Sequence, residues 1–383
     1  MNKDKRYNFA LILKTDGLEY DDRVRKEILS IQKLYPNISF KIFVLLPDNK
    51  ESEGVTSYGI PYKSIKLQSR DKYASKEKLM LKSIEFYKVV SKDIKHFDAI
   101  WCAELATVVV AALAPKKHLI WDLHELPTAL LGNCCTRTLL KYIFKRCKVV
   151  VHANPQRTDY LKSLGLIRDA GKHYAIRNYP NFDDVDTVFD EKYQQFIAWK
   201  GNRRCVYLQG LSVQGRAAYE SIKAVLSHSD LVAVVIGDIY SPDKGKLMAE
   251  YGDKLEERVF FAGRINQLKI PQYVAQCIST LVFYQNIRAN NYYCEANRFY
   301  QSVIIGLPVV VGNNPPMRDI VNEYQFGVSV DDDGRDVEMM SSGLDQILSN
   351  YDYYKSNVLK NRDALTWDKQ EDVLSTIVEK LLS

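Results

Sequence analysis

Short apolar runs alternate with helix-length amphipathic segments along the whole chain. The run Phe9–Leu13 has the pattern of a strand, Asp22–Leu34 has helical periodicity, and Phe40–Leu46 is again typical of a strand. Three further strand candidates in this half end in polar loops: Ala99–Cys102, His118–Asp122 and Val149–Ala153. Strand, helix and strand in succession make a βαβ unit, so the pattern predicts a parallel sheet covered by helices.

The alternation is interrupted at residues 178–186, where one Pro, two Asn and three Asp fall within nine residues. Beyond this stretch the strand candidates are Cys205–Gln209, Leu231–Gly237, Val259–Gly263, Ser279–Tyr284 and Leu307–Gly312. We therefore predict an α/β protein with two Rossmann-like domains, residues 1–182 and 204–368, joined by a linker over 183–203. Residues 369–383 have a helical pattern and could pack back across the domain boundary.

The composition is that of an ordinary globular protein. The 383 residues are 46% hydrophobic and 26% charged, which excludes disordered, collagen-like and disulfide-scaffold classes. No apolar run reaches 18 residues, and the N-terminal residues lack the pattern of a signal peptide, so we expect a cytoplasmic protein. The cysteines are scattered without metal-site spacing, which favours free thiols: Cys102, Cys134, Cys135, Cys147, Cys205, Cys277 and Cys294.

The net charge of +6 conceals an asymmetry, because residues 1–182 carry an excess of Lys and Arg while the rest carry an excess of Asp and Glu. No zinc finger, RRM-type aromatic signature or basic zipper is present, so we expect no nucleic-acid partner. Phosphorylated small molecules or an anionic membrane surface fit a basic half better. Arg137, Lys141, Lys145 and Lys148 recur beside an apolar stripe, which would suit anionic lipid headgroups at the inner face of the membrane, or simply a solvated helix face.

Ligands of open parallel sheets collect at the carboxyl ends of the strands. After the first strand, Gly17 allows close backbone approach, and Asp22 could cap a helix that starts near Arg23 and holds an anion, although an ordinary turn would look the same. After a later strand, Asp122, His124 and Glu125 form a polar cluster. His124 could donate a hydrogen bond to a sugar hydroxyl, take up a proton, or be a structural histidine.

The second half holds two further candidate segments. Residues Gln209–Arg216 join a strand to a helix, with Gly210 and Gly215 in the turn and a cation at the helix start, where a pyrophosphate could bind. Residues Asn290–Gly312 form a polar loop, a short helix and a Gly-Leu-Pro turn that leads into a buried strand.

This last run resembles the donor-binding segment of GT-B glycosyltransferases, particularly glycosyltransferase family 4, which often reads Pro-Asn-Lys-x-x-Glu-x-x-x-x-Gly-x-Pro-Val-Val. Here Ala296 stands for the Pro, Asn297 and Arg298 for Asn-Lys, and Gln301 for the Glu, while Gly306 and Pro308 match directly. The resemblance extends to Asp22–Glu27, Asp122–Glu125, Arg177–Asn181, Gln209–Arg216 and Val259–Gly263.

The resemblance implies a GT-B architecture, in which two Rossmann-like domains face a central cleft, and a role for each matching residue. Arg216 and Arg298, with Gly210, would bind the donor diphosphate, and Gly263, Asn297 and Gln301 the nucleotide and its ribose. His124 and Glu295 would be the catalytic or sugar-contacting residues, and Gly17 and Arg23 the acceptor or phosphate loop. The usual pair of Glu residues would fall at Tyr293 and Gln301, so the ribose ligand is an amide here.

We therefore expect a metal-independent glycosyltransferase without a cofactor, which moves a sugar from a nucleotide-diphosphate donor to a glycan or lipid-linked acceptor, with retention of configuration by analogy. The run Asp331–Gly334 imitates the Asp-x-Asp metal motif of the GT-A class, but we interpret it as a solvated turn. Two alternatives are a non-catalytic GT-B subunit that binds a glycan or a partner, and a nucleotide-sugar epimerase.

Overall fold

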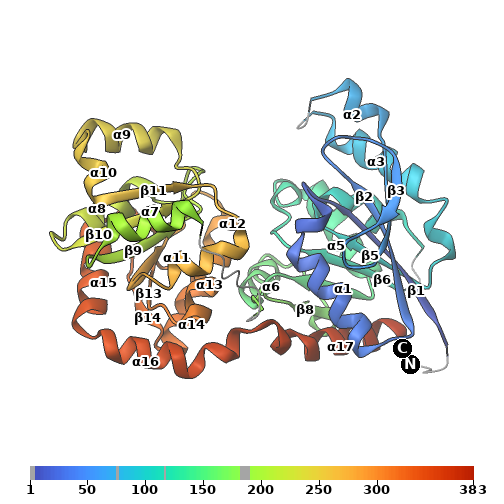
Figure 1. The fold of residues 1–383 in the computed structure, drawn as a ribbon. Helices are drawn as coiled ribbons and strands as arrows, with labels where there is room; N and C mark the ends of the chain where they lie inside the picture. The colour runs from blue at the N-terminus through green and yellow to red at the C-terminus, as the bar shows by residue number, and fades with distance from the viewer. Residues whose placement is uncertain (1–4, 75–76, 116–117, 182–189) are drawn as a thin grey trace. The chain divides into compact units, whose positions relative to one another are not determined.

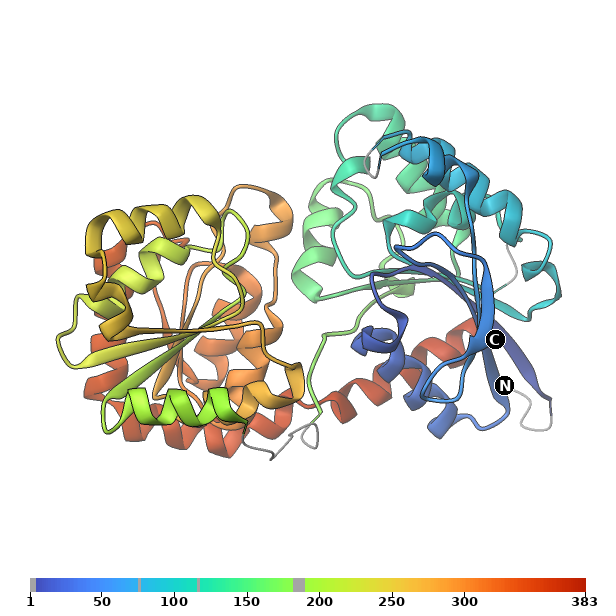
Figure 2. The ribbon, with the colours of Figure 1, turned by 45° about the horizontal axis from the view of Figure 1, so that its top comes forward.

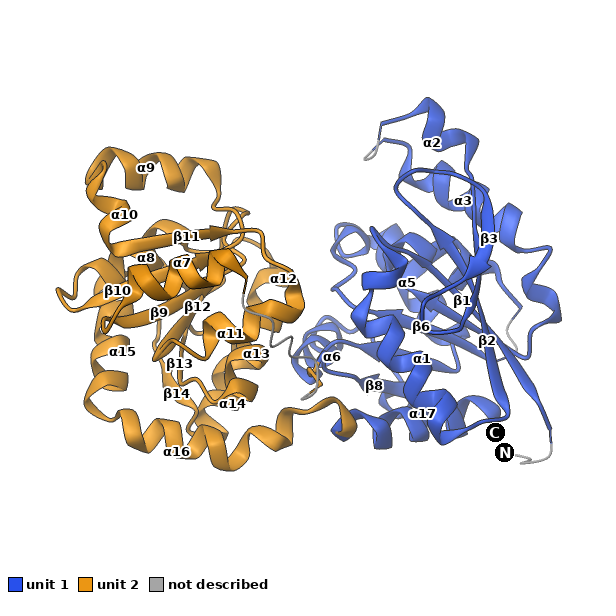
Figure 3. Ribbon diagram, in the orientation of Figure 1, with its two compact units in different colours: residues 1–178, 369–383 blue, residues 179–368 orange. Residues whose placement is uncertain are grey.

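The computed structural model describes residues 5–74, 77–115, 118–181 and 190–383. It divides into two compact units: residues 1–178 with 369–383, and residues 179–368 (Figure 3). Each unit holds one sheet with helices packed against it (Figure 1).

The first unit contains an eight-stranded sheet in the order β3-β4-β2-β1-β5-β6-β7-β8, parallel except for β3. Its strands are β1 Tyr7–Lys14, β2 Ile38–Leu45, β3 Ser52–Val55, β4 Pro61–Ser64, β5 Ala99–Ala103, β6 Leu119–Leu123, β7 Val149–His152 and β8 His173–Ala175. Its α-helices are α1 Asp22–Leu34, α2 Gln68–Lys72, α3 Leu79–Val90, α4 Val108–Leu113, α5 Cys134–Arg146, α6 Pro155–Ser163 and α17 Glu371–Leu382. Short 3₁₀ turns are η1 Leu18–Tyr20, η2 Ile94–His96, η3 Leu105–Thr107, η4 Thr128–Leu130 and η5 Ala170–Lys172.

The second unit contains a six-stranded, wholly parallel sheet in the order β11-β10-β9-β12-β13-β14. Its strands are β9 Arg204–Gln209, β10 Leu231–Ile236, β11 Val259–Gly263, β12 Ser279–Val282, β13 Val309–Val311 and β14 Gly327–Ser329. Its α-helices are α7 Glu191–Lys200, α8 Ala218–Leu226, α9 Ser241–Tyr251, α10 Lys254–Arg258, α11 Ile270–Val274, α12 Ala289–Tyr292, α13 Asn297–Ile305, α14 Pro315–Tyr324, α15 Val337–Ser349 and α16 Tyr351–Asn361, with 3₁₀ turns η6 Gln267–Lys269, η7 Arg362–Leu365 and η8 Trp367–Gln370.

The predicted fold class is confirmed, because the second sheet is wholly parallel, the first is parallel except for β3, and most of their strands coincide with the apolar runs. Strands β1, β5, β9 and β10 are buried along almost their whole length, as expected where helices cover both faces of a sheet. The C-terminal helix α17 packs against α1 of the first unit, as Figures 1 and 2 show. No described helix is both long and apolar enough to cross a membrane.

Three local predictions need correction. The predicted linker 183–203 contains helix α7, whose buried Phe196 joins the core of the second unit; residues 182–189 lie outside the described residues. Helix α1 begins at Asp22, and its cap is the preceding Asp21, whose carboxylate accepts a hydrogen bond from Val24 N at 3.4 Å. The antiparallel pair β3 and β4 is an element that the sequence pattern did not indicate.

The Asp331–Gly334 run is a turn, as predicted, but it is only partly solvated. Asp332 accepts hydrogen bonds from the backbone of the residues that follow it, and Asp333 is 8% exposed and accepts from Asn286 N at 2.7 Å. These carboxylates therefore hold loops of the second unit in place. All seven cysteines are free thiols.

Candidate functional site

A pocket of about 520 Å³ lies beyond the carboxyl ends of β9, β11 and β12 in the second unit. Its walls come from three segments: the loop after β9, the loop from β11 into α11, and the stretch from the end of β12 to α13. The lining residues are Gln209, Gly210, Arg216, Ile265, Gln267, Ile270, Tyr284, Cys294, Glu295, Ala296, Asn297, Arg298 and Gln301. The carboxyl edge of a parallel sheet is where ligands of such folds bind.

Two arginines gather around one aromatic ring in this pocket. The Arg216 guanidinium carbon lies 4.0 Å from the centroid of the Tyr284 ring, and that of Arg298 lies 5.1 Å from the same centroid. These separations are within the range of a cation–π contact. The ring thus holds two like charges near each other, an arrangement that suits a ligand with more than one negative charge.

Arg298 is the more buried of the two arginines, at 5% exposure. Its Nη2 donates a long bond of 3.4 Å to the Phe283 carbonyl, and its Nε is buried with no hydrogen-bond partner among the described residues. Burial, together with the charge of Arg216, lowers the pKa of Arg298. A buried cation with an unused donor is costly, and an anion in the pocket would relieve that cost.

Gly210 makes room for the Arg298 side chain. Its φ is +69°, a left-handed backbone conformation that residues other than glycine rarely adopt. A Cβ built at this position would lie 2.8 Å from Arg298 Nη1. Gly215 has φ +83°, and a Cβ there would lie 2.8 Å from Ile287 Cδ1. Both glycines of the loop are therefore required by the backbone and by close packing.

The structure brings six of the predicted donor residues into one pocket: Gly210, Arg216, Glu295, Asn297, Arg298 and Gln301. The Glu295 carboxylate accepts a hydrogen bond from the Tyr300 hydroxyl at 2.6 Å. Gly263, the last residue of β11, does not line this pocket, whereas Ile265 and Gln267 just beyond it do. Tyr284 was missed by the sequence analysis, because an aromatic residue at the end of an apolar run is equally typical of a core residue.

In the first unit, His124 belongs to a buried network of charges at the carboxyl end of β6. Arg23 binds both acids that face it, with Nε 2.9 Å from Glu27 Oε1 and Nη2 3.0 Å from Asp122 Oδ1. His124 Nδ1 lies 3.0 Å from Glu104 Oε1, and its Nε2 lies 3.4 Å from Asp122 Oδ2. The network therefore alternates positive and negative groups.

The protonation states follow from this alternation. Burial opposes the charged form of His124, but Asp122 and Glu104 outweigh it and raise the pKa of His124 to about 10. Burial, together with the charge of Asp122, raises the pKa of Glu27 to about 8. Burial would also raise the pKa of Asp122, yet Arg23 and His124 outweigh it and lower that pKa below its ordinary value. The raised pKa favours the protonated form of His124 at neutral pH, in which both ring nitrogens are donors.

Among the described residues, Glu27, Asp122 and His124 form a group whose ligand atoms lie within 4.8 Å of one another, which is close enough for a metal ion. The residues do not fit a metal, however. The guanidinium of Arg23 already binds both carboxylates, and a protonated imidazole has no lone pair to offer.

Arg23 is consequently not part of an acceptor or phosphate loop. It is 6% exposed, and its third bond, from Nη1, goes to the Ile176 carbonyl at 2.8 Å. Its bond to Glu27 lies within α1, and its bonds to Asp122 and Ile176 tie α1 to β6 and to the residue after β8 of its own unit, so its role is structural.

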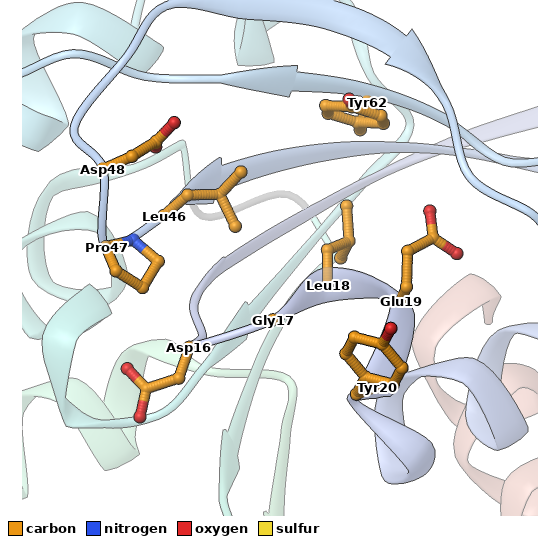
Figure 4. A pocket seen from close by; sticks show the side chains of 9 residues that line it. All are labelled: Asp16, Gly17, Leu18, Glu19, Tyr20, Leu46, Pro47, Asp48 and Tyr62. Atoms are coloured by element: carbon orange, nitrogen blue, oxygen red, sulfur yellow. The ribbon is translucent and has the colours of Figure 1, made fainter.

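Gly17 lies beside a second pocket, of about 310 Å³, at the carboxyl ends of β1 and β2 (Figure 4). The lining residues are Asp16, Gly17, Leu18, Glu19, Tyr20, Leu46, Pro47, Asp48 and Tyr62. Three carboxylates and no cation line it, so it is not suited to phosphate. Gly17 has φ −167°, an extended conformation open to any residue.

Helix α5 carries the predicted basic face. Arg137 and Lys145 are exposed, Lys141 and Lys148 are half-buried, and Leu140, Ile143 and Phe144 are buried. The apolar stripe is therefore used by the core of the first unit.

Three comparisons with known proteins bear on this site. Residues 209–363, which include most of the lining of the larger pocket, match the family described as Glycosyl transferases group 1. A comparison of the sequence with curated proteins gives no match. The fold comparison, in contrast, matches solved structures over nearly their full length.

One such structure is sucrose-phosphate synthase from Thermosynechococcus elongatus, with a TM-score of 0.76, 15% identity, and coverage of 98% of this chain and 99% of that one. Another is HepE from Anabaena in complex with UDP-glucose, with a TM-score of 0.73, 13% identity, and coverage of 98% and 100%. A third is the Escherichia coli trehalose-6-phosphate structure bound with UDP-2-fluoro glucose, with a TM-score of 0.73, 12% identity, and coverage of 98% and 99%. At these identities the likeness shows the GT-B fold.

Proposed function

We propose that this chain is a glycosyltransferase that binds a nucleotide-diphosphate sugar in the pocket of the second unit. It would pass the sugar to a hydroxyl group of a glycan or lipid-linked acceptor. The observation that carries the proposal is the pair of arginines on the Tyr284 ring, one of them buried with an unused donor. A diphosphate carries the negative charge that would balance the two guanidinium groups, and its oxygen atoms would accept their hydrogen bonds.

The pair also accounts for the chemistry. When the bond between sugar and diphosphate breaks, negative charge develops on the leaving diphosphate, and fixed cations beside it lower the barrier. Arg216 and Arg298 would supply the positive charge. The amino end of α8, two residues beyond Arg216, would add the positive end of the helix dipole. The two arginines would neutralise the leaving diphosphate, as a divalent cation does in other enzymes. We therefore expect transfer to proceed in the presence of a chelator.

The remaining residues of the pocket would hold the rest of the donor. Gln301 can accept a ribose hydroxyl through its amide carbonyl, and Glu295, oriented by Tyr300, can accept hydroxyls of the sugar. His124 of the first unit, as a cation, would donate a hydrogen bond to the sugar or stabilise developing charge, and would not act as a base.

The comparisons support this proposal. The family match spans the loop after β9 and the α13 segment, which are the two sources of arginine. Two of the similar structures were determined with UDP-glucose or a fluorinated UDP-sugar. UDP-hexoses are therefore the first donors to test. Membership of glycosyltransferase family 4 and a retaining mechanism are part of the proposal.

The test is a thermal-shift titration of the full chain with UDP, GDP, CDP and ADP in a chelating buffer. A ligand at 100 times its Kd stabilises a protein by about 2.7 kcal/mol, which is easily measured. The wild type should respond to one nucleotide, and Arg216→Ala should respond only at higher concentration. Arg204→Ala is the matched control, since Arg204 lies at the opposite end of β9 and pairs with exposed Asp230.

A lack of response to every nucleotide would contradict the proposal and favour a non-catalytic subunit. If a nucleotide binds, mass spectrometry of reactions with a donor sugar distinguishes the remaining possibilities. Transfer to an added acceptor supports the transferase, and conversion of the donor to an isomer without acceptor would indicate an epimerase. The anomeric configuration of the product, read by NMR, tests retention.

A further inference from the structure

Glu104, directly after β5 in the first unit, has a backbone conformation that suits glycine. Its φ is +70° and its ψ is 166°. Essentially only glycine adopts this combination, because a Cβ crowds the backbone there. Three other residues with positive φ have ψ values of 38°, 45° and 45°, in the left-handed helical region that non-glycine residues do adopt: Lys78, Ala217 and Gln325. Glu104 is therefore strained in a way that these residues are not.

Hydrogen bonds from buried neighbours hold Glu104 in this conformation. Its backbone N donates to the Asp122 carbonyl at 2.8 Å. Its carbonyl accepts from Thr107 Oγ1 at 2.8 Å and from Trp121 Nε1 at 3.3 Å, and both of these side chains are fully buried. All of these bonds use the main chain of Glu104, so a glycine could make them without the strain. What glutamate adds at this position is its carboxylate.

The Glu104 carboxylate is directed at the ring of His124. Its Oε1 lies 3.0 Å from His124 Nδ1. The other ring nitrogen is held less well, because His124 Nε2 lies 3.4 Å from Asp122 Oδ2 and is buried without a hydrogen bond to any described residue. Asp122 is also bound by the guanidinium of Arg23 at 3.0 Å. Glu104 is therefore the side chain that orients the imidazole ring.

We propose that Glu104 is a positioning residue for sugar transfer, and that its strained backbone serves to bring a carboxylate to His124 Nδ1. The inference rests on the proposed function, in which His124 donates a hydrogen bond to the sugar or stabilises developing charge. A carboxylate beside a histidine ring fixes its orientation and the positions of its protons. Glu104 acts through His124 and itself touches neither the donor nor the acceptor.

Two substitutions separate the strain from the carboxylate. Glu104→Gly removes both, whereas Glu104→Ala removes the carboxylate and keeps a Cβ in the strained conformation. Because this conformation destabilises the fold for any residue with a Cβ, Glu104→Gly should melt a few degrees above Glu104→Ala in differential scanning calorimetry. The matched control is Gln325→Gly, which changes a positive-φ residue at the end of α14 in the second unit and should keep the wild-type kcat.

The kinetics of transfer test the positioning role. Both Glu104 variants should lower kcat about 10- to 100-fold. Their nucleotide Kd should equal that of the wild type, because Glu104 does not line the nucleotide pocket. Glu104→Gln should recover part of the loss, since its amide oxygen can still accept from Nδ1. In a His124→Gln background, Glu104→Gly should cause no further loss, because its effect passes through the imidazole.

NMR of the His124 ring gives a readout that is independent of turnover. Loss of the carboxylate should lower the pKa of His124 in Glu104→Gly and in Glu104→Ala, relative to the wild type. The other charged groups around His124 are the same in every variant: Asp122 on β6, Arg23 and Glu27 on α1, and Arg157 on α6, which binds the His124 carbonyl.

Each of four results would overturn the proposal. They are a wild-type kcat in Glu104→Gly, a His124 pKa that neither substitution changes, a Glu104→Gly variant that melts below Glu104→Ala, and a further loss of kcat in the double variant. The last would mean that Glu104 contacts the substrate directly. A wild type that binds no nucleotide would instead contradict the proposed function, and the calorimetry and NMR would still test the strain and the contact with the ring.

Discussion

Replacing Arg298 with Met should weaken nucleotide binding and leave the free protein as stable as the wild type, or more so. Methionine keeps much of the length and the apolar stem of the arginine but removes its charge and its donors. In the free protein Arg298 makes one long hydrogen bond, to the Phe283 carbonyl, and a distant cation–π contact, while its Nε has no partner. The substitution therefore removes little that stabilises the free fold.

The magnitudes follow from burial. Arg298 is 5% exposed, so a charged hydrogen bond from it to a diphosphate would be worth about 1.5–3 kcal/mol, which corresponds to a roughly 10- to 150-fold increase in Kd. Replacing a buried charge by an apolar side chain of similar volume is often neutral or stabilising. We expect the melting temperature of free Arg298→Met to equal that of the wild type or to exceed it by a few degrees.

Isothermal titration calorimetry with the nucleotide that binds best, and differential scanning calorimetry of the free protein, provide the two readouts. Arg204→Met, at the other end of β9, should keep the wild-type Kd, because an exposed ion pair contributes little. The reasoning is refuted if free Arg298→Met melts well below the wild type while its Kd is unchanged, because Arg298 would then be a structural cation.

Three further predictions test other parts of the structure. Gly210→Ala should cost about 1–2 kcal/mol of stability and raise the nucleotide Kd, because φ is +69° and the new Cβ would lie 2.8 Å from Arg298 Nη1; a Kd equal to that of the wild type would argue against this account. The folded pKa of His124, about 10, lies above its unfolded value near 6.5, so its stabilising contribution is complete below pH 6.5 and is lost as the pH rises to about 10. Urea unfolding should show this decline up to about pH 10, overlapping the titration of Glu27 near pH 8, and His124→Gln should reduce it; equal slopes would mean that the imidazole is neutral. Neutralising Arg137, Lys141 and Lys145 to Gln should weaken sedimentation of the protein with anionic vesicles if the basic face of α5 contacts lipid headgroups; unchanged sedimentation would reject that contact.

Periodicity was sufficient to predict most of the fold. The run Asp22–Leu34 matches α1 at both ends, and Cys205–Gln209 matches β9 to within one residue, because Val24, Ile28 and Ile31 on one side of α1 and most of β9 are apolar and buried. The pattern failed at β3 and at α7. Strand β3 lies at the edge of the sheet and is largely exposed, so it has no apolar signal, and α7 follows a Pro- and Asp-containing stretch that indicated a linker.

The candidate site was predictable only where a residue type and a strand end coincide. Gly210, Arg216 and Arg298 follow strands or begin a helix, and the pocket brings them together. Tyr284, the ring that holds both arginines, gives no sequence signal of its own, since an aromatic residue at the end of an apolar run is equally typical of a core.

Arg23 shows why position in the chain does not decide whether a charge is available to a ligand. Its place after the first strand suggested an anion site, and the same place could have suited a phosphate had the side chain been free. Glu27 lies four positions along the same helix and reaches Arg23 within α1, whereas Asp122 lies 99 positions away and reaches it only through the packing of α1 against β6. Arg298 is the reverse case: it is equally buried, but no carboxylate faces it among the described residues, so its charge stays available. The difference between the surroundings of Arg23 and Arg298 is therefore set in part by a distant acid, Asp122, which a local motif cannot show.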